Sequence, residues 1–450
     1  MLETIESFNS WLNSYVWGLP MIALLIGTGV LLTILTGAAQ IRYLGRALSE
    51  VLGKLTQSGG GEGNVRPFQA VATALASTVG VGNIAGVATA ISIGGPGALF
   101  WLWVSGLFGM CTKYAEIVIA LNYREKDASG TMRGGAMYIL KNGLGLPWLG
   151  AVFALITALA AFGIGNMVQA NSVADAMQST FGVSTSTTGI VMTIITGAVI
   201  LGGIKRIGQV TELLVPFMAL LYLGGGIVIL ITHASHIPAA FALVFEGAFT
   251  GTAATGGFAG STIAMALRYG VARGLFSNEA GLGSAPMVHA AADTDHPVRQ
   301  GLYGIFEVFV DTLLICSTTG LVILVTDTWT SGATGAALST TAFETGLPGT
   351  WGDIVVTGGL LLFSFSTVVG WSYYGETGIV YLLGAKAAMP YRLAWLVFIY
   401  LGAVGSLQLI WDVADTLNGL MAIPNLIAVL ASIPLLLKLQ KEFFSRTRGS

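Results

Sequence analysis

The sequence predicts an all-α membrane protein with many transmembrane helices, and three observations support this fold class. Hydrophobic residues make up 54% of the 450 residues and charged residues only 9%, whereas about 25% of an ordinary soluble domain is charged. The mean hydropathy is +0.78. Long apolar segments recur along the whole chain. These features exclude a soluble enzyme or a secreted module, and the formal charge of −2 argues against a nucleic-acid partner.

Eleven apolar segments are long enough to cross a bilayer, for which a helix needs about 20 residues. They are residues 13–38, 67–93, 99–122, 148–178, 188–204, 211–232, 241–268, 301–326, 353–383, 393–411 and 416–438. The first is not interpreted as a signal peptide, because Glu3 and Glu6 precede it and a signal peptide begins with positive charge.

The distribution of Lys and Arg predicts the orientation. If the N-terminus lies outside, every Lys and Arg except Lys113 falls in a loop on the inner side, as the positive-inside rule requires. The sequence therefore predicts a multi-pass protein of the cell membrane with its C-terminus in the cytoplasm. The inner loops include residues 269–300, which are too polar for a predicted span and are a candidate inner lid.

Glycine-rich interruptions occur in the middle of two predicted spans. One lies at residues 76–83 of the second span and the other at residues 251–261 of the seventh, and both mix glycine with hydroxyl or amide side chains. A helix broken within a bilayer leaves N–H and C=O groups that are tolerated only inside protein or beside a cavity.

The two interrupted spans begin two oppositely oriented blocks of five spans. Such placement indicates an inverted-repeat transporter, with one repeat at 67–232, a second at 241–438, and span 13–38 outside both. We interpret residues 1–450 as one transmembrane domain.

Broken helices limit what the site can bind. Free N–H groups attract a carboxylate, and free carbonyls attract an ammonium group or a metal ion. A zwitterion beside sodium satisfies both. Span nine adds the hydroxyls of Ser364, Ser366 and Thr367, for which ordinary hydrogen bonding to the preceding helical turn is the alternative.

Four segments resemble a known family. They are VGVGN at 79–83, GGPGALFWLW at 94–103, RGLFSNEAGLGSAP at 273–286 and FSTVVGWSYYGE at 365–376. All four resemble the alanine or glycine:cation symporter family, also called the sodium:alanine symporters, within the amino acid–polyamine–organocation group. The resemblance implies a LeuT-type fold and sodium-driven import of a small neutral amino acid, alanine or glycine, by alternating access.

A further resemblance, of the first broken helix to that of the neurotransmitter:sodium symporters, implies site residues. The sodium ligands would be the carbonyls of Ala76, Val79 and Phe363 and the hydroxyls of Ser366 and Thr367. A second sodium is implied at Thr78 and Asn83. The substrate carboxylate is expected at the N–H groups of Gly80, Val81 and Gly82, with Thr78 beside them. The ammonium is expected near Thr255 and Gly256, with Gly257 beside them.

Other polar and aromatic residues in spans are further candidates. Asn166 and Gln169 share one face of span four and are expected to contact the zwitterion, with pairing between helices as the alternative. Phe258 and Trp371 are expected to wall the side-chain pocket or to be ordinary core.

Charged residues inside spans are functional candidates. We expect Lys113 to pair with Glu116, three residues away. Glu307, Asp311 and Glu376 are candidates for an inner gate or a proton step, so proton coupling is the alternative to sodium coupling. Asp175 and Glu246 are expected near the outer surface.

An intramembrane enzyme and a channel are the competing classes. The sequence holds no HExxH motif and its histidines lie in loops or at span ends, which disfavours hydrolytic chemistry. It also lacks the identical filter loops from which channels are built. The sequence therefore predicts a transporter and no enzyme.

Overall fold

The computed structural model describes residues 2–250, 262–405 and 408–446. The first half of the chain forms α1 (Leu2–Val16), α2 (Leu19–Leu35), α3 (Ala39–Arg42), α4 (Leu44–Gly53), α5 (Pro67–Thr78), η1 (Gly82–Gly86), α6 (Val87–Gly94), α7 (Gly97–Asn122), β1 (Glu125–Lys126), β2 (Met132–Arg133), α8 (Ala136–Tyr138), η2 (Ile139–Gly143), α9 (Pro147–Ala160), η3 (Ala161–Met167), α10 (Val168–Phe181), α11 (Thr185–Ile200), α12 (Gly203–Thr232), η4 (Ala234–His236) and α13 (Ile237–Phe249).

The second half forms α14 (Ile263–Asn278), α15 (Pro286–His289), α16 (Pro297–Val308), η5 (Phe309–Cys316), α17 (Ser317–Val325), η6 (Thr328–Thr330), α18 (Gly335–Gly346), α19 (Trp351–Leu383), η7 (Ala385–Ala387), α20 (Ala388–Val404), α21 (Gln408–Leu420), α22 (Ala422–Ala431) and α23 (Ile433–Arg446). The two short strands pair antiparallel, with Glu125 opposite Arg133.

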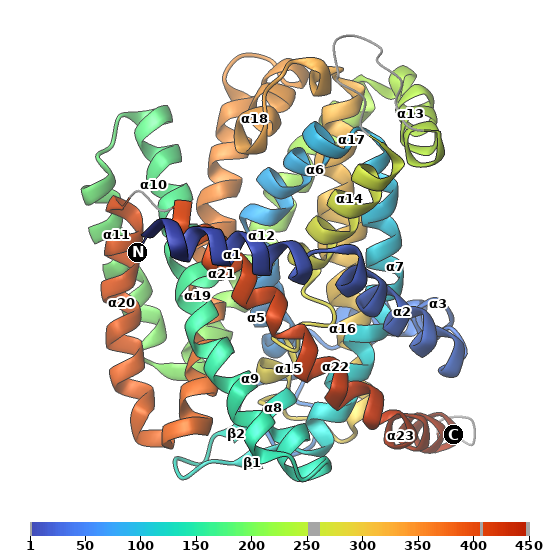
Figure 1. Ribbon diagram of the computed structural model, residues 1–450, viewed down its shortest axis with the longest axis vertical. Coiled ribbons are helices and arrows are strands. Elements are labelled where there is room, and N and C mark those ends of the chain that lie inside the picture. The colour runs from blue at the N-terminus through green and yellow to red at the C-terminus, as the bar shows by residue number, and fades with distance from the viewer. Residues whose placement is uncertain (1, 251–261, 406–407, 447–450) are drawn as a thin grey trace.

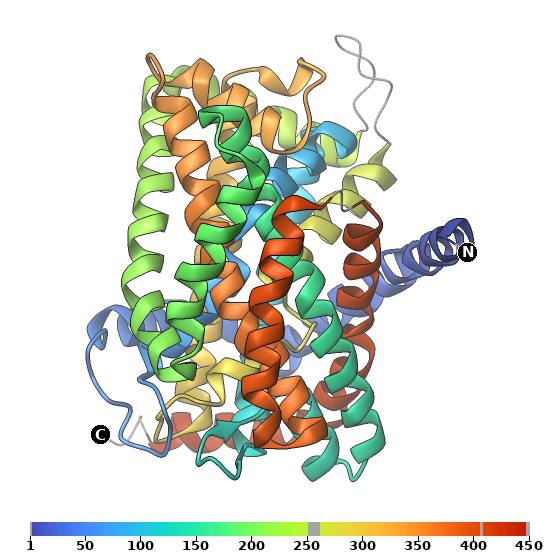
Figure 2. The same cartoon turned by 90° about the vertical axis from the view of Figure 1, so that its left-hand side faces the viewer.

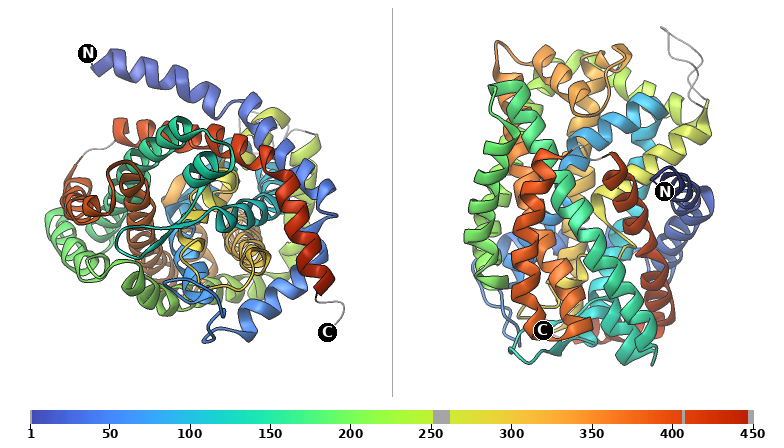
Figure 3. Two further views of the ribbon diagram at one scale, coloured as in Figure 1. Left: turned by 90° about the horizontal axis from the view of Figure 1, so that it is seen from below. Right: turned by 60° about the vertical axis from the view of Figure 1, so that its left-hand side comes forward.

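Long helices run side by side along the longest axis of the molecule (Figure 1), while α1 and α23 lie across it. The end that carries β1, β2, α8 and α23 is called the hairpin end here, and the end that carries α13 and α18 is called the α18 end. Figures 2 and 3 show that the C-terminus lies at the hairpin end, whereas α1 extends along the flank of the bundle.

Within the described ranges, eight helices are long and apolar enough to cross a membrane. A ninth is added if the bent pair Pro67–Thr78 and Gly82–Gly94 is one span, and two shorter apolar helices lie at Thr185–Ile200 and Ala234–Phe249. The membrane class and the helical fold are thus confirmed, and the count of eleven stays a prediction.

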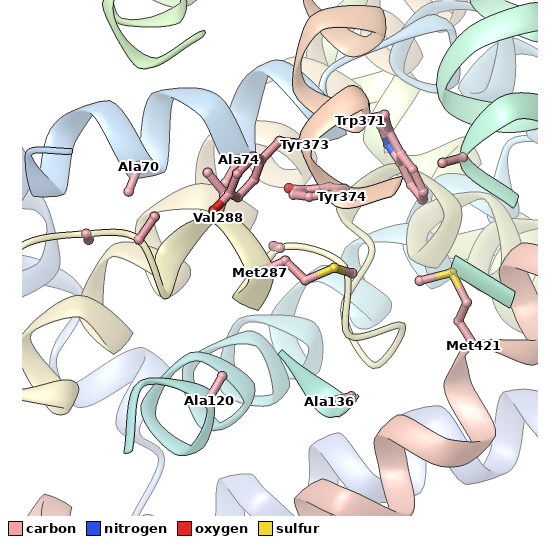
Figure 4. Packing of buried hydrophobic residues seen from close by; sticks show 14 of the residues in the cluster. Ala70, Ala74, Ala120, Ala136, Met287, Val288, Trp371, Tyr373, Tyr374 and Met421 are labelled. Atoms are coloured by element: carbon pink, nitrogen blue, oxygen red, sulfur yellow. The ribbon is translucent and has the colours of Figure 1, made fainter. Parts of the chain in front are cut away.

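The short helix α15 inserts between longer helices in the core. Met287 and Val288 of α15 are fully buried beside Trp371 and Tyr374 of α19 (Figure 4). On the other side lies α5, whose Ala74 belongs to the same buried cluster. A small residue at this position lets two helices approach closely.

The span predicted at 241–268 corresponds to parts of two separate helices in the described residues. In the structure α13 ends at Phe249 and α14 begins only at Ile263. Residues 269–300 were predicted to be an inner loop too polar to span, and the loop assignment is wrong, because α14 continues to Asn278 and the chain from Ser277 to Ala292 is buried. Its polar groups include some that bond to neighbouring helices: the Ser277 hydroxyl donates to Asp311 of η5 at 3.0 Å. Hydropathy averaging cannot detect such pairing.

The position of α14 changes the side of the membrane to which two basic residues are assigned. Arg268 and Arg273 were assigned to an inner loop, but they lie on α14, which Figure 1 places toward the α18 end. Near the C-terminus the predicted spans 393–411 and 416–438 are also shifted, because α20 ends at Val404 and α22 ends at Ala431. The remaining helix, α23, lies across the hairpin end (Figure 1).

Candidate functional site

The helix predicted to break at 76–83 is broken there. Helix α5 ends at Thr78, Val79 is extended (φ −79°, ψ 94°) and helical structure resumes at Gly82, with an angle of 52° between the two parts. The freed Gly80 N–H donates to the Asn83 side chain at 2.9 Å. The break therefore leaves main-chain groups in the interior without their helical partners.

Helix α19 places two hydroxyls against the end of α5. Oγ1 of Thr367 lies 3.1 Å from the Ala76 carbonyl oxygen, 3.3 Å from that of Val79 and 2.9 Å from that of Phe363. Oγ of Ser366 lies 3.1 Å from the Ala76 oxygen and 2.8 Å from the Phe363 oxygen. All five oxygens predicted to bind the first sodium are thus adjacent and buried.

Ser366 and Thr367 also donate to the Phe363 carbonyl in the preceding turn of α19. This is the ordinary hydrogen bonding that the sequence analysis gave as the alternative, and it occurs together with the contacts to α5. Hydroxyls that donate to carbonyls in this way can rotate and present lone pairs instead. Oxygen ligands from carbonyls and hydroxyls suit a hard cation. The cluster is therefore chemically able to hold sodium. Ser364, the third candidate, has no hydrogen-bond partner among the described residues.

A second break follows α14. Glu279 has φ +56°, Gly281 φ +91° and Gly283 φ +78°, and α15 begins at Pro286. The side chain of Glu279 accepts a hydrogen bond from the Ser284 hydroxyl at the far end of the break. The interruption predicted at 251–261, with Thr255, Gly256, Gly257 and Phe258, lies outside the described residues.

The two breaks face each other. Helix α14 packs against α6, and α15 packs against α5. A Cβ atom added to Gly82 would lie 3.2 Å from Cδ1 of Phe276. Asp311 of η5 connects the breaks, since it accepts hydrogen bonds from Asn83 at 2.6 Å and from Ser277 at 3.0 Å. The two discontinuous helices therefore form one site.

A cavity of about 240 Å³ adjoins this point. It is lined by Gly82, Gln169 and Phe276, among others, and also by Arg273 and Trp411. A larger cavity of about 750 Å³ shares Trp411 with it and is also lined by residues of α18, so this route leads toward the α18 end. Asp175, predicted near the outer surface, lines the larger cavity.

The other predicted substrate residues have different positions. Gln169 lies at the break, with Oε1 3.5 Å from the Val81 nitrogen. Asn166 does not reach the site, because its Nδ2 donates to the Trp395 carbonyl at 2.9 Å. Trp371 does not line the cavity either; it is 1% exposed, and its Nε1 donates to Glu279 at 2.9 Å. For Asn166 the structure thus shows the alternative of pairing between helices, and for Trp371 the alternative of ordinary core packing.

The sequence analysis missed Phe276 and Ser277 as site residues, although both stand in the segment 273–286 that carries the family resemblance. It also assigned the wrong partner to Lys113. Its Nζ lies 3.2 Å from Glu307 of α16, while Glu116 accepts a hydrogen bond from Asn425. Sequence spacing predicts partners on one helix only, and here the neighbouring helix supplies a closer one.

At the hairpin end, Glu376 joins two arginines. It lies 2.7 Å from Arg133 of β2 and 2.6 Å from Arg392 of α20. Arg133 also pairs with Asp127 at 3.0 Å. Partial burial acts to raise the pKa of Asp127, but hydrogen bonds from Ser129 and other loop groups and from Arg133 outweigh it and lower that pKa. The network ties the hairpin to α19 and α20.

Comparisons with known proteins identify the family of this chain. The profile of the sodium:alanine symporter family matches residues 2–450. The sodium/alanine symporter AgcS of Methanococcus maripaludis is 51% identical over 426 residues, which cover 93% of this chain and 92% of that protein. The probable sodium/glutamine symporter GlnT of Bacillus subtilis is 38% identical over 433 residues, which cover 95% of this chain and 88% of that protein.

Among solved structures, a variant of the manganese transporter of Eremococcus coleocola has a TM-score of 0.51 at 14% identity, over 81% of this chain and 77% of that chain. At this identity the likeness shows a common fold only. The chain belongs to the sodium:alanine symporter family and is a sodium-coupled amino acid symporter of the membrane, not an enzyme.

Proposed function

We propose that this symporter imports alanine or glycine together with sodium by alternating access. The observation that carries the proposal is the group of five oxygens from α5 and α19 beside the glycine-lined break. A small zwitterion and a monovalent cation fit this site, because main-chain dipoles can meet both charges of the zwitterion.

The first sodium binds the carbonyls of Ala76, Val79 and Phe363 and the hydroxyls of Ser366 and Thr367. A second sodium is proposed at Thr78 and Asn83, and the contacts support Asn83 more than Thr78. The Thr78 hydroxyl donates to the Ala74 carbonyl at 3.1 Å, whereas Asn83 contacts the buried Asp311 carboxylate. The hydrogen bonds to Asp311 come from neutral side chains, so a cation here would offset a buried negative charge. We therefore add Asp311 to this site.

The substrate carboxylate faces the N–H groups from Gly80 to Gly82, with Gln169 beside them. The ammonium faces the C-terminal end of α14, because carbonyl groups at a helix end carry partial negative charge and Ser277 lies opposite Gly82. This placement replaces the one at Thr255 and Gly256. Phe276 and Trp411 form the bulky walls, in place of Phe258 and Trp371, and they favour a small side chain.

The LeuT-type architecture with eleven spans also belongs to this proposal. Two broken helices that face each other, as α5–α6 and α14–α15 do, support an inverted repeat. The first repeat covers 67–232, the second begins at α14 instead of residue 241, and span 13–38 lies outside both. The N-terminus is outside and the hairpin end is cytoplasmic, which agrees with the basic residues at that end.

The test is uptake of labelled alanine and glycine into proteoliposomes, with an inward sodium gradient or with choline in its place at fixed pH. We expect uptake with sodium and none with choline. Proton coupling is the second candidate, favoured by Glu116 and Glu279, two buried carboxylates that have no cation within 4.0 Å among the described residues. Uptake that persists in choline and follows a proton gradient would establish it instead.

A further inference from the structure

One buried hydrogen bond connects the proposed sodium site with the second helix break. On α19, Trp371 follows the proposed sodium ligand Thr367 by four residues, so the two side chains lie one turn apart on the same face of the helix. Nε1 of Trp371 donates to the Glu279 carboxylate at 2.9 Å, and both side chains are at most 3% exposed. The bond therefore joins the helix that carries the hydroxyl ligands to the break that is proposed to face the ammonium group.

Glu279 holds the second break in its shape. It ends α14 with φ +56°, a left-handed conformation that a non-glycine residue keeps only where surrounding contacts enforce it. One carboxylate oxygen accepts from Trp371 and the other accepts from the Ser284 hydroxyl, five residues further along the chain. The Lys113 ammonium, which pairs with Glu307, also attracts this carboxylate electrostatically. The Glu279 side chain thus spans the break and ties it to α19.

The indole of Trp371 is held in place on several sides. A Cβ atom on Gly165 of η3 would overlap the Cβ of Trp371. Tyr374 contacts the indole edge-on, with the ring centroids 5.2 Å apart, and Met287 of α15 lies in the same buried cluster (Figure 4). Close packing of this kind leaves no room for the ring to rotate. A shift of α19 therefore moves the indole N–H relative to Glu279.

We propose that the Trp371–Glu279 hydrogen bond couples sodium binding to alanine binding, with Trp371 as a positioning residue outside the substrate cavity. This inference rests on the proposed function. A sodium ion held by the five oxygens of α5 and α19 fixes α19 relative to α5. Trp371 then holds Glu279, and with it the C-terminal end of α14 around Ser277, in the conformation that receives the ammonium group. Sodium raises the affinity for alanine in this way, and alanine raises the affinity for sodium by the same factor.

The test measures binding of labelled alanine to the purified full chain in detergent, in sodium and in choline at equal ionic strength. The ratio of the two dissociation constants is the coupling factor, which is roughly 5- to 150-fold for typical coupled sites. Trp371→Phe keeps a buried aromatic ring and removes the N–H donor. We expect its coupling factor to fall to about one fifth of the wild-type value or less, with the affinity in choline within about twofold of wild type.

Trp395→Phe is the matched control. Trp395 is also fully buried, and its Nε1 has no hydrogen-bond partner among the described residues, so this variant should keep the wild-type coupling factor. Glu279→Met removes the acceptor of the same bond and should give the same loss as Trp371→Phe, which it replaces if that variant does not fold. Glu279→Gln keeps an oxygen that accepts from the indole and should retain most of the coupling.

A wild-type coupling factor in Trp371→Phe, or an equal loss in Trp395→Phe, would overturn the proposal. Alanine affinity that falls equally in sodium and in choline would also overturn it, because it would show that Trp371 only supports the fold. If sodium has no effect on alanine binding in wild type, the proposed function itself is contradicted. The two failures are therefore distinguishable in one set of measurements.

Discussion

Replacing Thr367 with valine is the most direct test of the sodium site. Valine keeps the volume and the branching of threonine and removes only Oγ1. That atom is central to the cluster, because it lies within 3.3 Å of three carbonyl oxygens, those of Ala76, Val79 and Phe363. The substitution thus deletes one proposed sodium ligand without opening a cavity.

The magnitude follows from the strength of a polar contact to a charged group, which is about 1.5–3 kcal/mol. Since about 1.4 kcal/mol corresponds to a tenfold change in affinity, the sodium concentration for half-maximal uptake should rise roughly 10- to 150-fold. The hydroxyl also bonds α19 to α5 through the Ala76 carbonyl, and loss of this bond should reduce stability by about 1 kcal/mol.

The assay is alanine uptake into proteoliposomes over a series of sodium concentrations, together with the thermal midpoint of each variant. Ser364→Ala is the matched control, because this buried hydroxyl lies three residues away on α19 and has no hydrogen-bond partner among the described residues. It should leave the sodium dependence unchanged. A Thr367→Val protein with wild-type sodium dependence, or an equal effect in Ser364→Ala, would refute the ligand assignment.

Three further substitutions test the site and the hairpin end. Gly82→Leu should abolish alanine binding, because a Cβ at this position would already lie 3.2 Å from the Phe276 ring. Gly27→Leu, where a Cβ meets nothing within 4 Å, is the control, and alanine binding retained in Gly82→Leu would contradict a substrate site at Gly80 to Gly82. Phe276→Ala should widen the pocket and raise uptake of larger amino acids relative to alanine by about 10-fold or more; an unchanged ratio in competition assays argues against this wall. Arg133→Gln should lower the free energy of unfolding by about 1.5–3 kcal/mol, since Asp127 and Glu376 each lose a charge-assisted hydrogen bond, although Glu376 keeps its pair with Arg392. Lys126→Gln at an exposed pair should cost below about 1 kcal/mol, and equal thermal midpoints in the two variants would contradict this.

The sequence was sufficient for features that depend on local composition. The membrane class follows from the scarcity of charge. The first break was predicted at the correct residues because glycine, hydroxyl and amide groups are concentrated there within an apolar span. The resemblance then brought Ser366 and Thr367 to the Ala76 carbonyl, and the structure has these atoms in contact.

The second break could not be placed in this way. Its segment contains the polar residues Ser277, Asn278, Glu279 and His289. The mean hydropathy of the segment therefore predicts a solvent-exposed loop, although all four side chains are buried. The same limit explains the wrong partner of Lys113, because i,i+3 spacing contains no information about α16.

By itself, then, the sequence determined that the chain is a membrane transporter and where its first helix opens. Only the tertiary structure decided which polar groups meet across helices: Ser277 with Asp311, His289 with Glu307, and Trp371 with Glu279. The physical reason is that a polar group enters the membrane interior when a partner from another helix satisfies it, and that partner is far away in the sequence.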